Sequence, residues 1–308
     1  MGGIAGANLA SAVSEAGALG VLGLFRMRPQ SIQAVVLATA ARTTRAFGVN
    51  LIPELMAPSE LTDQIEAVLQ ASRPNVFFVF FGMPEADTCQ RLLKSGRRFV
   101  VMTGDVDSVS LAESLGAAAI VLQGIEAGGH LLGEKPLAAL VQAVRERGCR
   151  LPIVAAGGIG TGQDFRKLVE LGAEGCMCGT LFAATLESRA HPQYKTRLVE
   201  GRADDTLITD AYKIGWPNRR HRVLRTSVTD QHDRAKPAHF IPTTRIDDRR
   251  HPIARYSAFA PDEQTQGNIS EMAMYAGTSV DAVHEIVSAR DRLERFVAQY
   301  TYATTIVP

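Results

Sequence analysis

AAAIVLQGIEAGGH, residues 117–130, is the stretch of sequence that decides the fold. Its first half is an uninterrupted apolar run, which is typical of a strand buried on both faces of a parallel sheet. The pair Gly128-Gly129 then allows a tight turn that most other residues cannot adopt. A single histidine, His130, follows that turn directly. The pattern predicts a buried strand whose end carries a titratable side chain.

Two later apolar runs also end in glycine, at residues 153–158 (IVAAGG) and 175–180 (GCMCGT). The carboxyl ends of the strands in an α/β barrel meet at one face, where active sites lie. Glycine-rich strand ends at that face favour phosphate binding through backbone N–H groups. The residues that we expect to bind a phosphate there are Gly157, Gly158, Gly179 and Thr180.

Strand-like and helix-like segments alternate from the start of the chain to about residue 185, which selects a parallel α/β fold. The expected strands lie at residues 21–24, 47–52, 75–81, 99–102, 117–122, 153–156 and 175–180. The glycine positions favour a TIM-type (β/α)8 barrel over an open sheet. Because only seven strands can be counted, the barrel is predicted to lack its first strand.

The pattern changes beyond that series, and Gly215-Trp216-Pro217 interrupts the chain. We predict a barrel over residues 1–215 and a smaller, partly helical region over residues 216–308 that covers the barrel mouth. The basic run at 219–225 is interpreted as a solvated face. Ser279 is a possible N-cap for a last helix that runs to about residue 300.

Composition sets the outer bounds. The chain has 308 residues, 46% hydrophobic content and a net charge of +1, so nothing draws it to nucleic acid or to anionic membranes. No apolar run reaches the ~18 residues expected of a membrane span. The four cysteines lack metal-site spacing and disulfide-framework density, which favours a reducing cytoplasm. Cys176 and Cys178 are read as small buried residues, and Glu126 as a solvated loop carboxylate.

Together these motifs make the chain resemble the FMN-dependent nitronate monooxygenases, formerly called 2-nitropropane dioxygenases, and the related FMN-dependent enoyl-acyl-carrier-protein reductases. The resemblance covers the chain from its first residue to about residue 195. The segments that carry it are 47–50 (FGVN), 123–130 (QGIEAGGH), 155–159 (AAGGI), 179–180 (GT), 187–188 (ES) and 191–195 (HPQYK).

The resemblance implies an FMN cofactor across the barrel mouth, with its phosphate at the four residues named above. It places Gln123 and Gly128 against the flavin ring and Asn50 at a ring-edge hydrogen bond. His130 would lie beside the flavin and exchange a proton with the substrate or hold its negative charge. The implied reaction oxidises an alkyl nitronate or nitroalkane with dioxygen to a carbonyl compound and nitrite.

The chain departs from the family pattern at Gly160-Thr161-Gly162, at Leu131-Leu132-Gly133 and at its start. Family members begin with a strand that ends in Ala-Pro-Met-Gly-Gly, whereas this chain begins Met1-Gly2-Gly3 and is expected to enter a helix at about Ala7. Either a start codon assigned too far downstream or a true truncation would produce this pattern.

Two other functions fit the same sequence. One is an NAD(P)H-dependent flavin oxidoreductase of the enoyl-thioester reductase type, which would use the same barrel, flavin and histidine. The other is a non-catalytic relative that only binds a phosphate ligand. The sequence does not identify the physiological substrate, the use of NAD(P)H or the oligomeric state.

Overall fold

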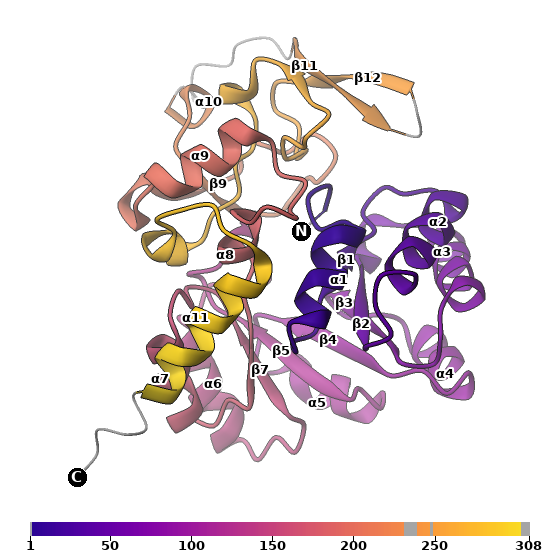
Figure 1. Ribbon diagram of the computed structural model, residues 1–308. Helices are drawn as coiled ribbons and strands as arrows, with labels where there is room; N and C mark the ends of the chain where they lie inside the picture. Colours follow the sequence, from indigo (N-terminus) through magenta and orange to yellow (C-terminus); the bar gives the residue numbers. More distant parts are fainter. Residues whose placement is uncertain (1, 231–238, 247–248, 303–308) are drawn as a thin grey trace.

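A computed structural model describes residues 2–230, 239–246 and 249–302 (Figure 1). Its core is one parallel sheet whose strands follow one another in chain order and curl into a half-barrel. All seven predicted strands are confirmed. They are β1 (Val21–Gly23), β2 (Phe47–Leu51), β3 (Val76–Phe81), β4 (Phe99–Thr103), β5 (Ala119–Gln123), β7 (Ile153–Ala156) and β8 (Gly175–Met177).

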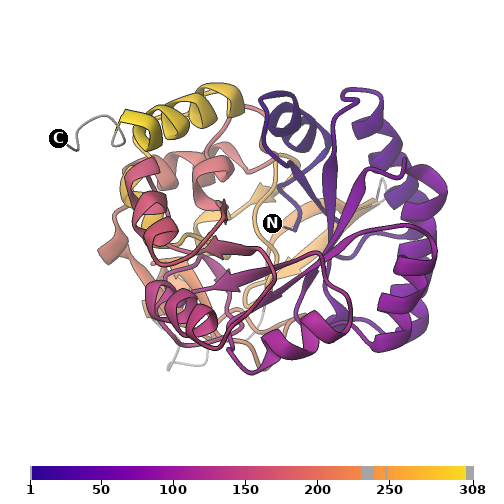
Figure 2. The ribbon, with the colours of Figure 1, turned by 90° about the horizontal axis from the view of Figure 1, so that it is seen from below.

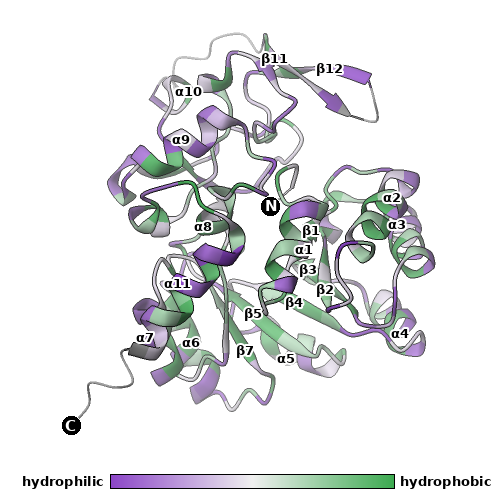
Figure 3. Ribbon diagram, viewed as in Figure 1, coloured by the Kyte–Doolittle hydropathy of each residue, from purple (hydrophilic) through white to green (hydrophobic). Residues whose placement is uncertain are grey.

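Helices cover the outer face of this sheet, as Figure 2 shows from below. Outward-facing apolar side chains of the strands form the main core with the inner faces of the helices, while a smaller apolar cluster fills the concave side. In Figure 3 the strands of this sheet are mostly green, and purple residues appear mainly on the helices and on the outer segments such as β12 (Arg249–Ala254). The helices of this layer are α1 (Ala7–Glu15), α2 (Pro29–Ala40), α3 (Pro58–Ala71), α4 (Ala86–Lys94), α5 (Ser108–Ser114), α6 (Leu137–Glu146) and α7 (Gly162–Glu170).

The parallel register brings the functional strand ends together. Gln123, the last residue of β5, pairs with Ala156, the last residue of β7. Gly157 therefore begins its turn beside Gln123. Asn50 near the end of β2 likewise pairs with Gly23 on one side and Val79 on the other. The predicted site residues thus leave the sheet at one end, as parallel strands require.

The two edges of the sheet are β1 and β8. Within the described residues no strand joins them, although the Gly23 N–H of β1 donates a hydrogen bond of 2.9 Å to the Ala5 carbonyl. Outside this opening, α1 packs against both α2 and the last helix, α11 (Ala289–Tyr302). The outer layer of helices therefore continues across the open edges, where Figure 2 shows the yellow last helix next to the indigo first helix.

The rest of the chain surrounds the mouth of the half-barrel. Its helices are α8 (Thr180–Ala183), α9 (Pro192–Glu200) and α10 (Ser227–Asp230), with short 3-10 turns at Pro53–Leu55, Ala203–Asp205, Ile269–Glu271 and Thr278–Ala282. Its strands are β6 (Gly129–His130), β9 (Thr206–Thr209), β10 (His221–Leu224), β11 (Phe240–Ile246), β12 (Arg249–Ala254) and β13 (Gln266–Gly267). The expected boundary at residue 215 falls between β9 and β10, which pair in one small sheet with β6.

Two local expectations are wrong. The basic run at 219–225 is not simply a solvated face, because its centre forms β10 and buries His221, Val223 and Leu224. The last helix begins at Ala289, and Ser279 lies in a separate 3-10 turn. Ser288 is the residue at that helix start, where its hydroxyl accepts a hydrogen bond of 3.0 Å from the Asp291 N–H.

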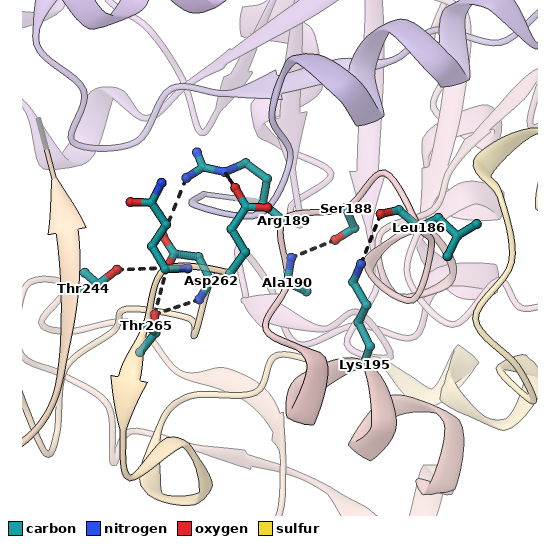
Figure 4. Close-up of polar contacts among 10 residues, drawn as sticks. Leu186, Ser188, Arg189, Ala190, Lys195, Thr244, Asp262 and Thr265 are labelled. Carbon is teal, nitrogen blue, oxygen red and sulfur yellow. Dashed lines mark hydrogen bonds and ion pairs between the residues drawn. The ribbon is translucent and has the colours of Figure 1, made fainter. Parts of the chain in front are cut away.

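The loop that follows α8 joins the N-terminal segment to the segment around residue 262, and its contacts with the latter are drawn in Figure 4. The Arg189 N–H donates to the Ile4 carbonyl at 3.0 Å, and the Arg189 carbonyl accepts from the Glu263 N–H at 2.7 Å. Asp262 beside it is buried and accepts hydrogen bonds from the hydroxyls of Thr244 and Thr265, at 2.9 and 2.8 Å. This loop anchors the segment around residue 262 near the opening of the sheet.

Candidate active site

His130 lies at the centre of an aromatic cluster at the mouth of the half-barrel. Its strand β6 follows the glycine turn after β5, in which Gly129 adopts a φ of 86°. The imidazole stacks on Trp216 with ring centroids 3.8 Å apart and an interplanar angle of 14°. His221 and Tyr275 lie at 5.0 and 5.4 Å from the same ring. Two segments distant in sequence from His130 therefore enclose its imidazole, one with Trp216 and His221 and the other with Tyr275.

The His130 side chain is only 6% exposed, and its Nε2 atom has no hydrogen-bond partner among the described residues. Burial, followed by the nearby His221 and Arg219, lowers the pKa of His130 from 6.5 to about 2. The imidazole is consequently neutral near pH 7. An unpaired buried polar atom costs free energy, so such an atom at a strand end marks a position for a ligand.

Gln123 holds the histidine segment in place. Its side-chain Nε2 donates to the His130 carbonyl at 3.0 Å, and its Oε1 accepts from the Leu132 N–H at 2.8 Å. Because the amide binds the backbone on both sides of Leu131, it holds the segment that leaves β6 directly after His130. The structure thus shows Gln123 supporting the histidine.

The glycine ends of β7 and β8 form a concave backbone surface. Gly157 and Gly158 adopt φ values of 110° and 70°, a region that other residues rarely occupy. Gly179 is the N-cap of α8, and Thr180 is its first residue. The backbone N–H groups of these four residues donate no hydrogen bond to any other residue that the structure describes. Such unpaired donors at consecutive left-handed glycines and at a helix start suit an anion.

A segment of the C-terminal region closes over this surface. The Gly277 N–H donates to the Thr180 hydroxyl at 3.0 Å, and the Thr278 N–H donates to the Glu126 carbonyl at 3.0 Å. A Cβ atom at Gly128 would overlap the backbone of Gly277. The close approach that Gly128 permits is therefore, in this structure, an approach by protein backbone.

Asn50 lies near the end of β2. In the order of the strands, β3 and β4 separate it from β5 and the histidine loop. Its side-chain Nδ2 donates to the Val79 carbonyl at 3.1 Å, which holds the amide against β3. It also lines a cavity of about 220 Å³. The predicted site residues thus follow the ends of β2, β5, β7 and β8.

Sequence reasoning missed Trp216 and His221, which complete the surroundings of His130. Trp216 is the only tryptophan of the chain and sits in the Gly-Trp-Pro break, a signal that could have marked it. His221 was hidden in the basic run. Glu126 was expected to be solvated, but its carboxylate accepts the N–H of Leu137 at 3.0 Å, at the start of α6.

Three further features of the described part of the chain bear on other kinds of site or location: metal-binding groups, the cysteine pair and apolar helices. No group of three or more His, Cys, Asp or Glu side chains is arranged there to bind a metal ion. Cys176 and Cys178 do interact, and the contact lowers the pKa of the Cys176 thiol while that of Cys178 is raised. None of the helices in these residues combines the length and the apolar character needed to cross a bilayer.

Comparison with known proteins agrees with this geometry. The model of the nitronate monooxygenase family matches residues 1–299. A nitronate monooxygenase of Paraburkholderia phytofirmans is 30% identical, over 68% of this chain and 69% of its own length. A Mycobacterium tuberculosis protein, (3aS,4S,5R,7aS)-5-hydroxy-7a-methyl-1-oxo-octahydro-1H-indene-4-carboxyl-CoA dehydrogenase, is also 30% identical, over 75% of this chain and 63% of its own length.

Among solved structures, FabK from Thermotoga maritima superposes with a TM-score of 0.79 and 25% identity, over 99% of this chain and 93% of the other. A nitroalkane oxidase from Streptomyces ansochromogenes has a TM-score of 0.78 at 24% identity, which shows the shared fold. The match of the family model over nearly the whole chain, on a half-barrel with the histidine and glycine strand ends in place, shows that this chain belongs to the nitronate monooxygenase family of oxidoreductases.

Proposed function

We propose that the protein oxidises alkyl nitronates with dioxygen, giving a carbonyl compound and nitrite, with FMN as cofactor. The observation that carries this proposal is the buried Nε2 atom of His130, which has no partner among the described residues and lies at the mouth of the half-barrel. Membership of the nitronate monooxygenase family supports the reaction class.

The residues present fit a flavin mononucleotide. Four unpaired backbone N–H groups, at Gly157, Gly158, Gly179 and Thr180, would hold its single phosphate. Asn50, Gln123 and Gly128 would border its ring, with Gln123 acting through the His130 segment. When bound, the flavin supplies the electron transfer to dioxygen that no side chain can perform.

His130 acts in this proposal as a neutral imidazole. Its lowered pKa makes it a weak base, so the removal of a proton from a neutral nitroalkane is unfavourable. A nitronate has already lost that proton and carries its charge on the nitro oxygens. A hydrogen bond donated from Nε2 can hold one of these oxygens and orient the substrate. We therefore propose the nitronate, rather than the neutral nitroalkane, as substrate.

The test is an anaerobic flavin-reduction assay. The FMN-loaded protein is mixed separately with an alkyl nitronate, with the parent nitroalkane, and with NADH or NADPH, and the flavin absorbance is followed. We expect rapid bleaching by the nitronate alone. Denaturing the loaded protein and identifying the released flavin checks FMN against FAD, and FAD would contradict the cofactor assignment.

A second function is favoured by one observation, the superposition on FabK over nearly the whole chain. An NAD(P)H-dependent reductase of the enoyl-thioester type would be bleached by NADH or NADPH and not by the nitronate. A non-catalytic relative that binds only a phosphate ligand would retain no flavin after reconstitution. The same assay therefore separates all three functions.

A further inference from the structure

Arg26 is an arginine in an unusual backbone conformation at the mouth of the half-barrel. It follows β1 and has a φ of 58°, the left-handed region that non-glycine residues seldom occupy. Among the described residues its guanidinium forms no ion pair and no hydrogen bond. A strained backbone that presents an unpaired charge is a common feature of ligand-binding positions.

Aromatic and glycine residues hold this guanidinium in place. Its Cζ lies 5.0 Å from the centroid of the Phe25 ring and 5.8 Å from that of Phe259. A Cβ atom at Gly215 would overlap Nη2, so the arginine rests against the one residue type that leaves room for it. Cation–π contacts of this kind orient a guanidinium without neutralising its charge. Its hydrogen-bond donors remain available.

Arg26 lines a cavity of about 220 Å³ at the ends of β1 and β2. Six apolar residues contribute to its wall: Leu24, Phe25, Leu51, Ile52, Leu55 and Met56. At ~30 Å³ for each water the volume equals that of roughly seven waters. This is smaller than the ~300–1,000 Å³ typical of a pocket for a whole ligand. The cavity therefore suits one apolar segment of a ligand.

The polar side chains that line this cavity differ in whether they already form hydrogen bonds within the protein. The side-chain N–H groups of Asn50 and Gln64 already donate to the carbonyls of Val79 and Met27. Glu60 is exposed, and it forms no ion pair with Arg26. Arg26 is thus the charged donor at the cavity that has no protein acceptor in the described part of the chain. A planar guanidinium pairs best with a carboxylate, through two parallel hydrogen bonds.

We propose that Arg26 and this cavity form a substrate subsite, which binds an apolar chain ending in a carboxylate. Asn50 belongs both to this cavity and to the predicted flavin edge, so a substrate could extend from the catalytic region to Arg26. This inference rests on the proposed function for the identity of the reacting group. It goes beyond that function by assigning the chemical class of the other end of the substrate.

The first test measures kcat/KM for two nitronates of equal chain length, those of nitrohexane and of nitrohexanoate with its terminal carboxylate. Wild type should prefer the carboxylate form. A charge-assisted hydrogen bond contributes ~1.5–3 kcal/mol, so Arg26→Asn should reduce that preference by about 10- to 100-fold. Asparagine tolerates the left-handed backbone, which keeps the fold. Arg26→Lys keeps the positive charge but loses the two parallel N–H donors of the guanidinium. Its preference for the carboxylate form should lie between those of wild type and Arg26→Asn.

Arg42→Asn serves as the matched control, because Arg42 is an exposed arginine whose guanidinium donates to the Ala38 carbonyl of its own helix. It should leave the preference unchanged. An equal preference for the two nitronates in wild type, or a ratio that Arg26→Asn does not alter, would overturn the subsite.

The second test does not depend on turnover. Trp216 is the only tryptophan and lies 5.7 Å from the Phe25 ring, so its fluorescence reports on this cavity. Titration with hexanoate should change the emission of wild type and not of Arg26→Asn, and hexanol should bind more weakly. If neither nitronate is oxidised but hexanoate binding still depends on Arg26, the proposed function fails and the subsite stands. If nitronates are oxidised and hexanoate binding ignores Arg26, the subsite fails.

Discussion

His130 and His221 face each other across an antiparallel strand pair, with their ring centroids 5.0 Å apart. The Tyr212 N–H lies 3.3 Å from Nε2 of His221 and the Arg219 carbonyl lies 3.2 Å from its Nδ1, contacts that fit a neutral ring protonated on Nδ1. A proton added to either ring raises the free energy of adding one to the other. The pair therefore favours two neutral imidazoles at the mouth of the half-barrel.

Replacing His221 by glutamine should raise the pKa of His130. The neighbouring ring is one cause of the lowered value, but burial is the larger cause and remains. The acid limb of the pH profile of kcat/KM should therefore move to higher pH, while the pKa of His130 stays below 6.5. Histidine NMR titration measures the shift directly. An unchanged His130 titration would show that the two rings are not coupled.

His130→Asn should retain the flavin and lose most turnover. Asparagine is shorter than histidine and cannot place a donor where Nε2 lies, and a hydrogen bond to a charged group is typically worth ~1.5–3 kcal/mol, about 10- to 100-fold in rate. Steady-state rates on a nitronate, together with the flavin content of the purified variant, check this. Turnover close to that of wild type would remove His130 from the mechanism.

The buried histidine should also make stability depend on pH. In the unfolded chain His130 binds a proton below its usual pKa of 6.5, whereas the folded chain keeps it neutral down to about 2. The unfolded state thus binds more protons in this interval, and stability falls as the pH drops through it. Between about pH 7.5 and pH 5, Tm should decrease more for wild type than for His130→Asn. Parallel Tm curves would contradict the low pKa.

Glu54 should position Trp216 against His130. Its carboxylate accepts the Trp216 indole N–H at 2.8 Å and pairs with Arg219. Glu54→Ala leaves the half-buried donors without a partner, at a cost of ~1–3 kcal/mol, and should shift the tryptophan emission and lower kcat.

Glu54→Gln keeps an acceptor for the indole and should show a smaller effect. The neighbouring exposed pair of Arg220 and Glu134, at 3.3 Å, provides the control. Glu134→Ala should cost ~0–1 kcal/mol and leave the emission unchanged. Equal effects of the alanine variants at Glu54 and Glu134 would contradict the positioning role.

Gly128→Ala should displace the segment around Gly277 from Thr180. The new methyl group would overlap backbone, which cannot move as a side chain can, and overpacking typically costs ~1–3 kcal/mol. Flavin retention should fall with it. Gly129→Ala separates this effect from backbone strain, because Gly129 has a positive φ, which Gly128 does not, and open space where its Cβ would lie. It should lower Tm with less loss of flavin, and the reverse order would contradict the packing argument.

Much of the fold could be predicted because its signals are local. Each buried strand is a short apolar run, and glycine marks the strand ends at residues 157–158 and 179. Chain order then fixes strand order, since neighbouring βα units of such a sheet lie side by side. The seven strands and the nearness of Gln123 to Gly157 were therefore accessible from sequence, and so was His130 as the candidate histidine.

The surroundings of that histidine could not be predicted. His221 belongs to a basic run that resembles a solvated face, and only its pairing with β6 shows that alternate side chains point inward. Glu126 resembled an exposed loop carboxylate until the start of α6 was placed beside it. Both cases depend on contacts between distant segments, and nothing in the sequence of either segment indicates which other segment it will contact.

The sequence by itself determined the parallel sheet, the glycine strand ends and the histidine, because turn conformation and burial of an apolar run depend on neighbouring residues. Tertiary structure decided that Trp216 stacks on His130, that His221 faces it, and that Arg26 stands unpaired among the described residues beside a cavity. These relationships arise from register and packing between distant segments, and those are set by the total free energy of the fold rather than by any local pattern.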